Sequence, residues 1–201
     1  MIGVFGGSFN PIHIGHLIIA EYIRCEFNLE KIIFIPAKMP PHKNGDAMTS
    51  AQHRFNMVSI AIEGNPNFLV SRIELDREGK SYTIDTLSQL VKLYPNNKLC
   101  FICGADSLMN FNSWRSIDEI FRLADIIIAG RPDIPEEDFR ETLINYRQNH
   151  DAHIFCSESP FMDISSTRIR ERIKKGMSIK YMVPDKVDRY IKSHGLFVGE
   201  I

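Results

Sequence analysis

The strongest constraint on the fold is a regular alternation of short apolar runs with longer segments of helical periodicity. The apolar runs are rich in Ile, Val and Phe and have the length of buried strands. Between them, apolar residues recur every three to four positions, which is typical of amphipathic helices. Several central runs are apolar at consecutive positions, so both faces of those strands should be covered. The alternation therefore predicts a parallel sheet with helices on both faces.

The pattern can be assigned element by element. The expected strands are 2–5, 31–36, 68–73, 99–103, 125–130 and 153–156. The expected helices are 15–27, 51–63, 83–93, 116–123, 136–148, 166–175 and 184–193. In the second helix, Phe55, Val58 and Ile62 should share the buried face. A chain of 201 residues suits one such domain, so we expect a single α/β domain over 1–201 with a Rossmann-like, doubly wound parallel sheet.

Composition and charge exclude several classes of protein. The formal net charge of −1 provides no basic footprint for nucleic acid, so we expect no nucleic-acid partner. No apolar run approaches the roughly 20 residues that span a bilayer, so we expect no membrane partner. The sequence opens with a strand-like run and has no charged segment followed by an apolar stretch, so we expect no signal peptide. These features favour a cytoplasmic protein, and the oligomeric state is left open, a homo-oligomer included.

Cys100 and Cys103 form a CxxC motif inside an apolar run. A redox or metal role is one interpretation, but a redox CxxC normally opens a helix, and no second CxxC follows. We therefore expect both cysteines to be reduced residues of a buried strand.

The first strand leads into a glycine pair and a histidine pair, Gly6-Gly7 and His13-x-Gly15-His16. The glycines allow a sharp turn or a close approach of backbone to phosphate. The two histidines are three positions apart and can share one face of the first helical turn, with Gly15 leaving room for a ligand. The helix start adds free N–H groups and a positive dipole end. A zinc site is the alternative, but helical zinc pairs are usually spaced i, i+4. The segment is best interpreted as a phosphate cradle.

A second motif, Ser165-Ser166-Thr167-Arg168-x-Arg170, opens a late helix. Either serine can be the N-cap. Arginines in a first turn oppose the helix dipole unless an anion binds there. Converging hydroxyls, N–H groups and guanidinium groups suit a polyphosphate. A solvated basic face is the alternative, because lysines follow in the same helix.

Together these motifs resemble those of the HxGH nucleotidyltransferase superfamily, and within it those of bacterial nicotinate-nucleotide adenylyltransferases. The resemblance covers nearly the whole chain. It rests on segments 6–16, 40–43, 81–87, 104–106 with Trp114, and 164–170.

The resemblance implies a set of roles. His16 and His13 would be catalytic, with His16 stabilising charge on the α-phosphate. The implied ATP-binding residues are Gly6, Gly7, Ser8, Phe9, His13, His16, Gly104, Asp106, Ile164, Ser165, Ser166, Thr167 and Arg170. The implied acceptor-binding residues are Lys43, Tyr82, Thr83 and Trp114, with Trp114 stacking on the pyridine ring. The substrates would be ATP and nicotinate mononucleotide. Mg²⁺ would arrive with ATP, without protein ligands of its own.

Three positions depart from the family pattern. Ser8 stands where Thr is common, and Asn10 where Asp is common, but both retain hydrogen-bonding ability. Arg115 follows Trp114 where an aromatic residue is frequent, so the pyridine-side contacts are less defined.

Three other functions match parts of the sequence. A phosphopantetheine adenylyltransferase has the same chemistry, but those chains tend to be shorter and to lack a match to Trp114. A nucleotide sensor without catalysis is the alternative from another class, and pyrophosphate release separates it from an enzyme. Class I aminoacyl-tRNA synthetases share the His13-x-Gly15-His16 pattern, but their second signature is only weakly echoed at 176–180.

Overall fold

The computed structural model describes residues 1–40, 48–130, 135–160 and 162–199. Its strands are β1 Ile2–Gly7, β2 Lys31–Pro36, β3 Phe68–Val70, β4 Leu99–Gly104, β5 Ala124–Ala129 and β6 Ile154–Cys156. Its helices are α1 Ile14–Glu26, α2 Ala51–Ile62, α3 Thr83–Leu93, α4 Ala105–Met109, α5 Ile117–Leu123, α6 Glu136–Asn149, α7 Ser166–Lys174 and α8 Asp185–Ser193, with the 3₁₀ turn η2 Phe111–Ser113.

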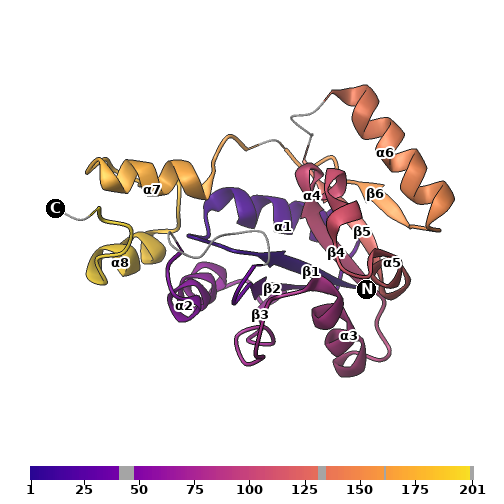
Figure 1. The fold of residues 1–201 in the computed structure, drawn as a ribbon. Coiled ribbons are helices and arrows are strands. Elements are labelled where there is room, and N and C mark those ends of the chain that lie inside the picture. The colour runs from indigo at the N-terminus through magenta and orange to yellow at the C-terminus, as the bar shows by residue number, and fades with distance from the viewer. Residues whose placement is uncertain (41–47, 131–134, 161, 200–201) are drawn as a thin grey trace.

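The six strands form one parallel sheet in the order β3-β2-β1-β4-β5-β6. The chain runs outward from β1 to β3, then crosses back and runs outward from β4 to β6 (Figure 1). The strand order therefore reverses between β1 and β4. This reversal is where doubly wound sheets leave a crevice at the carboxyl ends of their strands.

Side chains along each strand alternate between two cores because successive residues point to opposite faces of a sheet. Val4, Ile33 and Phe101 pack on one face against α3, α4, α5 and α6. Phe34 and Ile102 pack on the other face against α1, α2, α7 and α8. The predicted Rossmann-like, doubly wound parallel sheet is thus confirmed.

The CxxC of β4 illustrates this alternation. Cys100 lies in one core and Cys103 in the other, because residues three apart on a strand face opposite sides of the sheet. Both are buried and free. The interpretation as a buried strand is confirmed.

Three local predictions were wrong. The third strand ends at Val70 rather than at 73, because the Ser71 hydroxyl accepts a hydrogen bond from the Ile73 N–H and the chain turns. The short helix α4 was missed, since five residues are too few to show a helical period. On α2 the buried face carries Arg54 rather than Phe55, whose ring lies half-buried against an arginine.

No helix within the described ranges has both the length and the apolar character needed to cross a membrane.

Candidate active site

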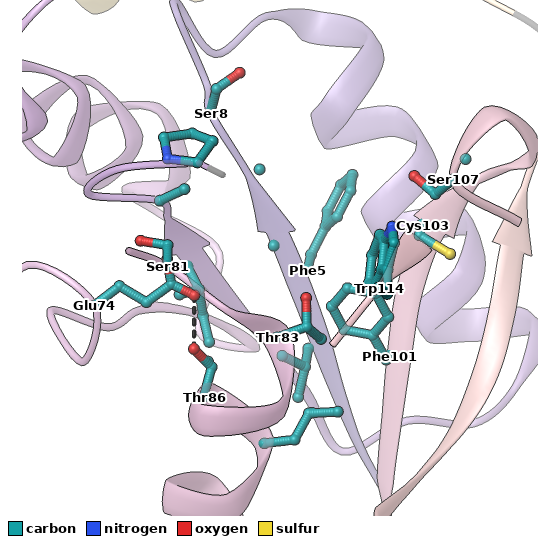
Figure 2. Close-up of a pocket in the computed structure, with 18 residues that line it drawn as sticks. Phe5, Ser8, Glu74, Ser81, Thr83, Thr86, Phe101, Cys103, Ser107 and Trp114 are labelled. Carbon is teal, nitrogen blue, oxygen red and sulfur yellow. Dashed lines mark hydrogen bonds between the residues drawn. The ribbon is translucent and has the colours of Figure 1, made fainter. Parts of the chain in front are cut away.

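A cavity of about 240 Å³ opens at the carboxyl ends of β1 and β4, where the strand order reverses. We call it the central cavity. Gly7 and Gly104 contribute the ends of the two strands. Phe5, Thr83 and Trp114 surround it, from β1, the start of α3 and the turn after η2 (Figure 2). The topology therefore brings together segments that are far apart in the sequence.

The turn after β1 is made by Phe9. Its backbone has φ 43°, a left-handed value that is uncommon for a bulky residue, whereas Gly6 and Gly7 do not have positive φ. The Phe9 ring is 1% exposed, and a Cβ on Gly7 would lie 3.0 Å from it. The prediction that Gly6 or Gly7 makes a sharp turn is therefore wrong, because Phe9 makes it. Gly6, Gly7 and Ser8 line the central cavity, so close backbone approach to a ligand remains a prediction.

His13 and His16 stack on each other at the start of α1. Their ring centroids are 3.6 Å apart, with an interplanar angle of 28°. His13 is the N-cap residue and is only 7% exposed. Its backbone N–H donates to Nδ1 of His16 over 3.2 Å. The histidine pair predicted from the spacing is therefore formed.

Burial decides the charge of this pair. It lowers the pKa of His13 to about 4. The pKa of His16 lies well below its ordinary value, first because of burial and then because of repulsion from His13. Both imidazoles are therefore neutral at pH 7. Because Nδ1 of His16 accepts a hydrogen bond, its proton resides on Nε2, which makes Nε2–H a donor.

Gly15 makes room for His13. A Cβ on Gly15 would lie 3.1 Å from Nδ1 of His13 and 3.4 Å from Cβ of Met162. Gly15 is therefore needed for the close packing of His13, and its role in leaving space for a ligand stays a prediction.

The second motif packs directly on the first. The Ser166 hydroxyl donates to the Pro11 carbonyl over 2.8 Å. Arg170 donates to the Asn10 carbonyl over 2.8 Å and to the Thr167 hydroxyl over 3.2 Å. The contacts with Pro11 and Asn10 join residues more than 150 positions apart and bring the start of α7 to the β1–α1 loop.

The N-cap of α7 is Ser165, whose Oγ accepts a hydrogen bond from the Arg168 N–H. The preceding Ile164 is half-buried and packs against the core beside α1 and α2. Arg168 pairs with the Asp163 carboxylate at 2.7 Å, and this offsets the unfavourable dipole contact without a bound anion. Arg170 has no such carboxylate partner among the described ion pairs, so the anion argument applies to Arg170 alone.

Gly104 and Asp106 lie at the junction of β4 and α4. Gly104 is the N-cap of α4, and a Cβ on it would lie 2.5 Å from Oδ1 of Asp106. A side chain on Gly104 would displace the exposed Asp106 carboxylate, which folds back over the junction. Gly104 lines the central cavity, as predicted for a nucleotide contact, while Asp106 is exposed beside it.

A second cavity of about 400 Å³ adjoins the central one, and we call it the ring pocket. It is formed by residues 81–83, 113–115 and Ile120. Thr83 and Trp114 line both cavities. The Trp114 ring meets Phe111 edge-on at 4.8 Å, which anchors it against the core. The structure thus gathers the predicted residues Tyr82, Thr83 and Trp114; the fourth, Lys43, lies outside the described residues.

Arg54 is a buried residue that the sequence analysis missed. Its guanidinium, 0% exposed, donates to the carbonyls of Ser8, Lys38 and Thr49 at 2.8, 3.2 and 2.9 Å. Burial lowers its pKa to about 10, so it stays protonated at pH 7. It holds the loops after β1 and β2 together beside the central cavity. Its burial could have been inferred from helical spacing, because Arg54 lies three positions before the buried Met57 and so shares its face of α2.

Glu74 is a second residue that was missed. It is buried and lines the central cavity, and its carboxylate accepts a hydrogen bond from the Thr86 hydroxyl at 2.7 Å (Figure 2). Burial raises the pKa of Glu74. Arg77 donates to the same hydroxyl over 3.1 Å and sets its direction. No periodicity marks Glu74, because it lies in the irregular segment between β3 and α3.

The Cytidylyltransferase-like family matches residues 4–172, which include both motifs. Two curated relatives carry the name "Probable nicotinate-nucleotide adenylyltransferase". The protein from Thermoanaerobacter sp. (strain X514) is 43% identical, over 98% of this chain and 93% of its own length. The protein from Desulfitobacterium hafniense (strain DSM 10664 / DCB-2) is also 43% identical, over 98% of this chain and 95% of its own.

The chain is a member of the nicotinate-nucleotide adenylyltransferase family. It is therefore a nucleotidyltransferase. A solved structure of the Plasmodium falciparum nicotinic acid mononucleotide adenylyltransferase, complexed with NaAD, has the same fold with a TM-score of 0.77. At 20% identity, over 98% of this chain and 96% of that one, this likeness concerns the fold alone. Membership of the adenylyltransferase family confirms the resemblance found in the motifs.

Proposed function

We propose that the chain transfers AMP from ATP to nicotinate mononucleotide, which yields nicotinate adenine dinucleotide and pyrophosphate in NAD biosynthesis. The observation that carries this proposal is the contact between the two motifs. Ser166 and Arg170 bind the carbonyls of Pro11 and Asn10, just before the buried His13–His16 pair. The residues that we propose to bind phosphate therefore come from two distant segments of the chain that meet at the β1–α1 loop.

The reaction requires one bond to form and one to break. An oxygen of the acceptor phosphate attacks the α-phosphorus of ATP, and the bond from that phosphorus to the β-bridging oxygen breaks as pyrophosphate leaves. The attacking oxygen is already ionised at pH 7, so no general base is needed. Catalysis therefore rests on positioning and on stabilising charge.

His16 suits charge stabilisation in its neutral form. Its Nε2–H would donate to a non-bridging oxygen of the α-phosphate, which gains negative charge as the reaction proceeds. His13 holds the ring by stacking and by its backbone N–H. Arg170 and the N-terminus of α7 would hold the β- and γ-phosphates.

The remaining assignments follow the family resemblance, and Gly6, Gly7, Ser8 and Gly104 among them line the central cavity. We assign ATP contacts to Gly6, Gly7, Ser8, Phe9, Gly104, Asp106, Ile164, Ser165 and Thr167 in addition to the histidine pair and Arg170. Phe9 would shape the site indirectly, because its buried ring packs beneath Gly7. ATP enters as its magnesium complex, because phosphate oxygens and water are the ligands that Mg²⁺ prefers.

The acceptor would lie against Trp114, with its pyridine ring stacked and its acid group towards the start of α3. Tyr82 is the N-cap of α3 and makes no side-chain cap, so the first N–H groups of the helix lack that partner. Such groups can donate to a carboxylate but cannot accept from a carboxamide. Lys43 is proposed to bind the phosphate of the acceptor. The free cysteines suit a reducing compartment, and we place the reaction in the cytoplasm.

The deciding experiment measures pyrophosphate release from ATP with a panel of phosphate acceptors. Release with nicotinate mononucleotide and not with 4′-phosphopantetheine is the expected result. Release with phosphopantetheine alone would reassign the acceptor. Nucleotide binding without release from any acceptor would make the chain a sensor and overturn the proposal.

A further inference from the structure

Arg115 follows Trp114 directly, and its side chain closes one side of the ring pocket. The guanidinium carbon lies 5.1 Å from the centroid of the Tyr82 ring, within the range of a cation–π contact. This places a permanent positive charge over the N-cap residue of α3. The side chain is 60% exposed, so its movement costs little packing.

Asp85 is the nearest acidic partner of this charge among the described ion pairs. Nη1 of Arg115 lies 4.0 Å from Oδ2 of Asp85, which is too long for a hydrogen bond. The N–H groups of Arg115 therefore remain available for a stronger acceptor. Asp85 lies in the first turn of α3, so its charge opposes the binding of any anion at that end of the pocket.

A guanidinium group offers two parallel N–H donors that match a carboxylate, whereas a carboxamide is neutral and has only one oxygen acceptor. We propose that Arg115 is a specificity-determining residue of the ring pocket, favouring an aromatic acceptor that carries a carboxylate over the corresponding carboxamide, while Asp85 limits this preference. The inference rests on the proposed function, because it assumes a pyridine mononucleotide as the acceptor. It concerns the side chain of Arg115, in addition to the N–H groups at the start of α3.

The test compares kcat/KM for nicotinate and nicotinamide mononucleotide at one saturating ATP concentration. Arg115→Gln removes the charge from an exposed position and should leave the fold intact. We expect the acid-to-amide ratio to fall about fivefold, through a higher KM for the acid, since exposed charges contribute modestly. Arg115→Lys should keep more of the ratio than Arg115→Gln does, because lysine retains the positive charge but lacks the two parallel N–H donors of a guanidinium group.

Asp85→Asn provides the opposite change. Removing its charge should raise the acid-to-amide ratio about twofold, and added salt should shrink the ratio in the unmodified protein but not in Arg115→Gln. The KM for ATP should be the same in all variants. The inference is overturned if Arg115→Gln leaves the ratio unchanged, or if it lowers kcat/KM for both mononucleotides equally. Absence of pyrophosphate release from either mononucleotide in the unmodified protein would instead refute the proposed function.

Discussion

The two sides of the candidate active site are built differently. On the phosphate side, formed by the β1–α1 loop and the start of α7, His13 and Arg54 are buried and hydrogen bonds join the two ends of the chain. The ring pocket is formed mainly by half-buried and exposed side chains, and Arg115 meets Asp85 only at 4.0 Å. Groups aimed at developing charge act best when they are already in place. The recognition of the acceptor can instead be tuned by individual surface residues.

The largest expected effect tests the phosphate side directly. His16→Ala should lower kcat by about 10²–10³-fold, because it removes a preorganised donor. The fold should persist, which circular dichroism and the thermal midpoint check. His153→Ala, at an exposed histidine near the opposite end of the sheet, is the matched control. Normal turnover in a folded His16→Ala protein would remove the basis for treating this side as catalytic.

Arg54 tests whether the two loops depend on one buried cation. Arg54→Met keeps the aliphatic volume and leaves three carbonyls without their donor, so the free energy of unfolding should fall by about 3 kcal/mol. Urea denaturation measures this change. Arg72→Met, at an exposed arginine, should stay within about 0.5 kcal/mol of the parent. A similar small loss for Arg54→Met would show that the loops hold together without it.

The neutral histidine pair predicts a pH dependence of stability. The pKa of His13 is about 4 in the folded chain, below the ordinary 6.5, so the unfolded chain binds a proton first as the pH falls. The free energy of unfolding therefore has its full value above pH 6.5. It decreases as the pH falls towards 4, by at most about 3 kcal/mol. Urea denaturation between pH 7 and 4.5 measures it. His13→Asn should remove the part of the slope that His13 contributes and leave the part that His16 contributes. His153→Asn should leave the curve unchanged.

The smallest of these effects concerns the ring pocket as a whole. We expect kcat/KM for nicotinate mononucleotide to exceed that for the amide by at least about tenfold. Charged acceptors form hydrogen bonds of roughly 1.5–3 kcal/mol, and about 1.4 kcal/mol corresponds to a factor of ten. Equal values, or a preference for the amide, would mean that the donors at the start of α3 do not meet the acid group. Nucleotidyl transfer itself would remain supported.

Most of the fold could be predicted, because strands and helices are marked by patterns among residues that are close together in the sequence. The period of apolar residues locates β2 and α3 with the predicted bounds, and continuous apolarity at 99–103 indicates a strand covered on both faces. The two motifs are likewise runs of neighbouring residues, but their contact at the end of β1 depends on how the chain returns from the edge strand β6. The short α4 and the early end of β3 depend on single hydrogen bonds and turns, which carry no period.

The sequence by itself determined the alternation of strands and helices, the two motifs and the family. Only the tertiary structure decided that the histidines are neutral, that Phe9 makes the turn after β1, and that Gly15 makes room for His13. It also decided that Arg54 is buried. The reason is that periodicity and capping are properties of consecutive residues, whereas a pKa or a buried charge depends on distant segments that exclude water.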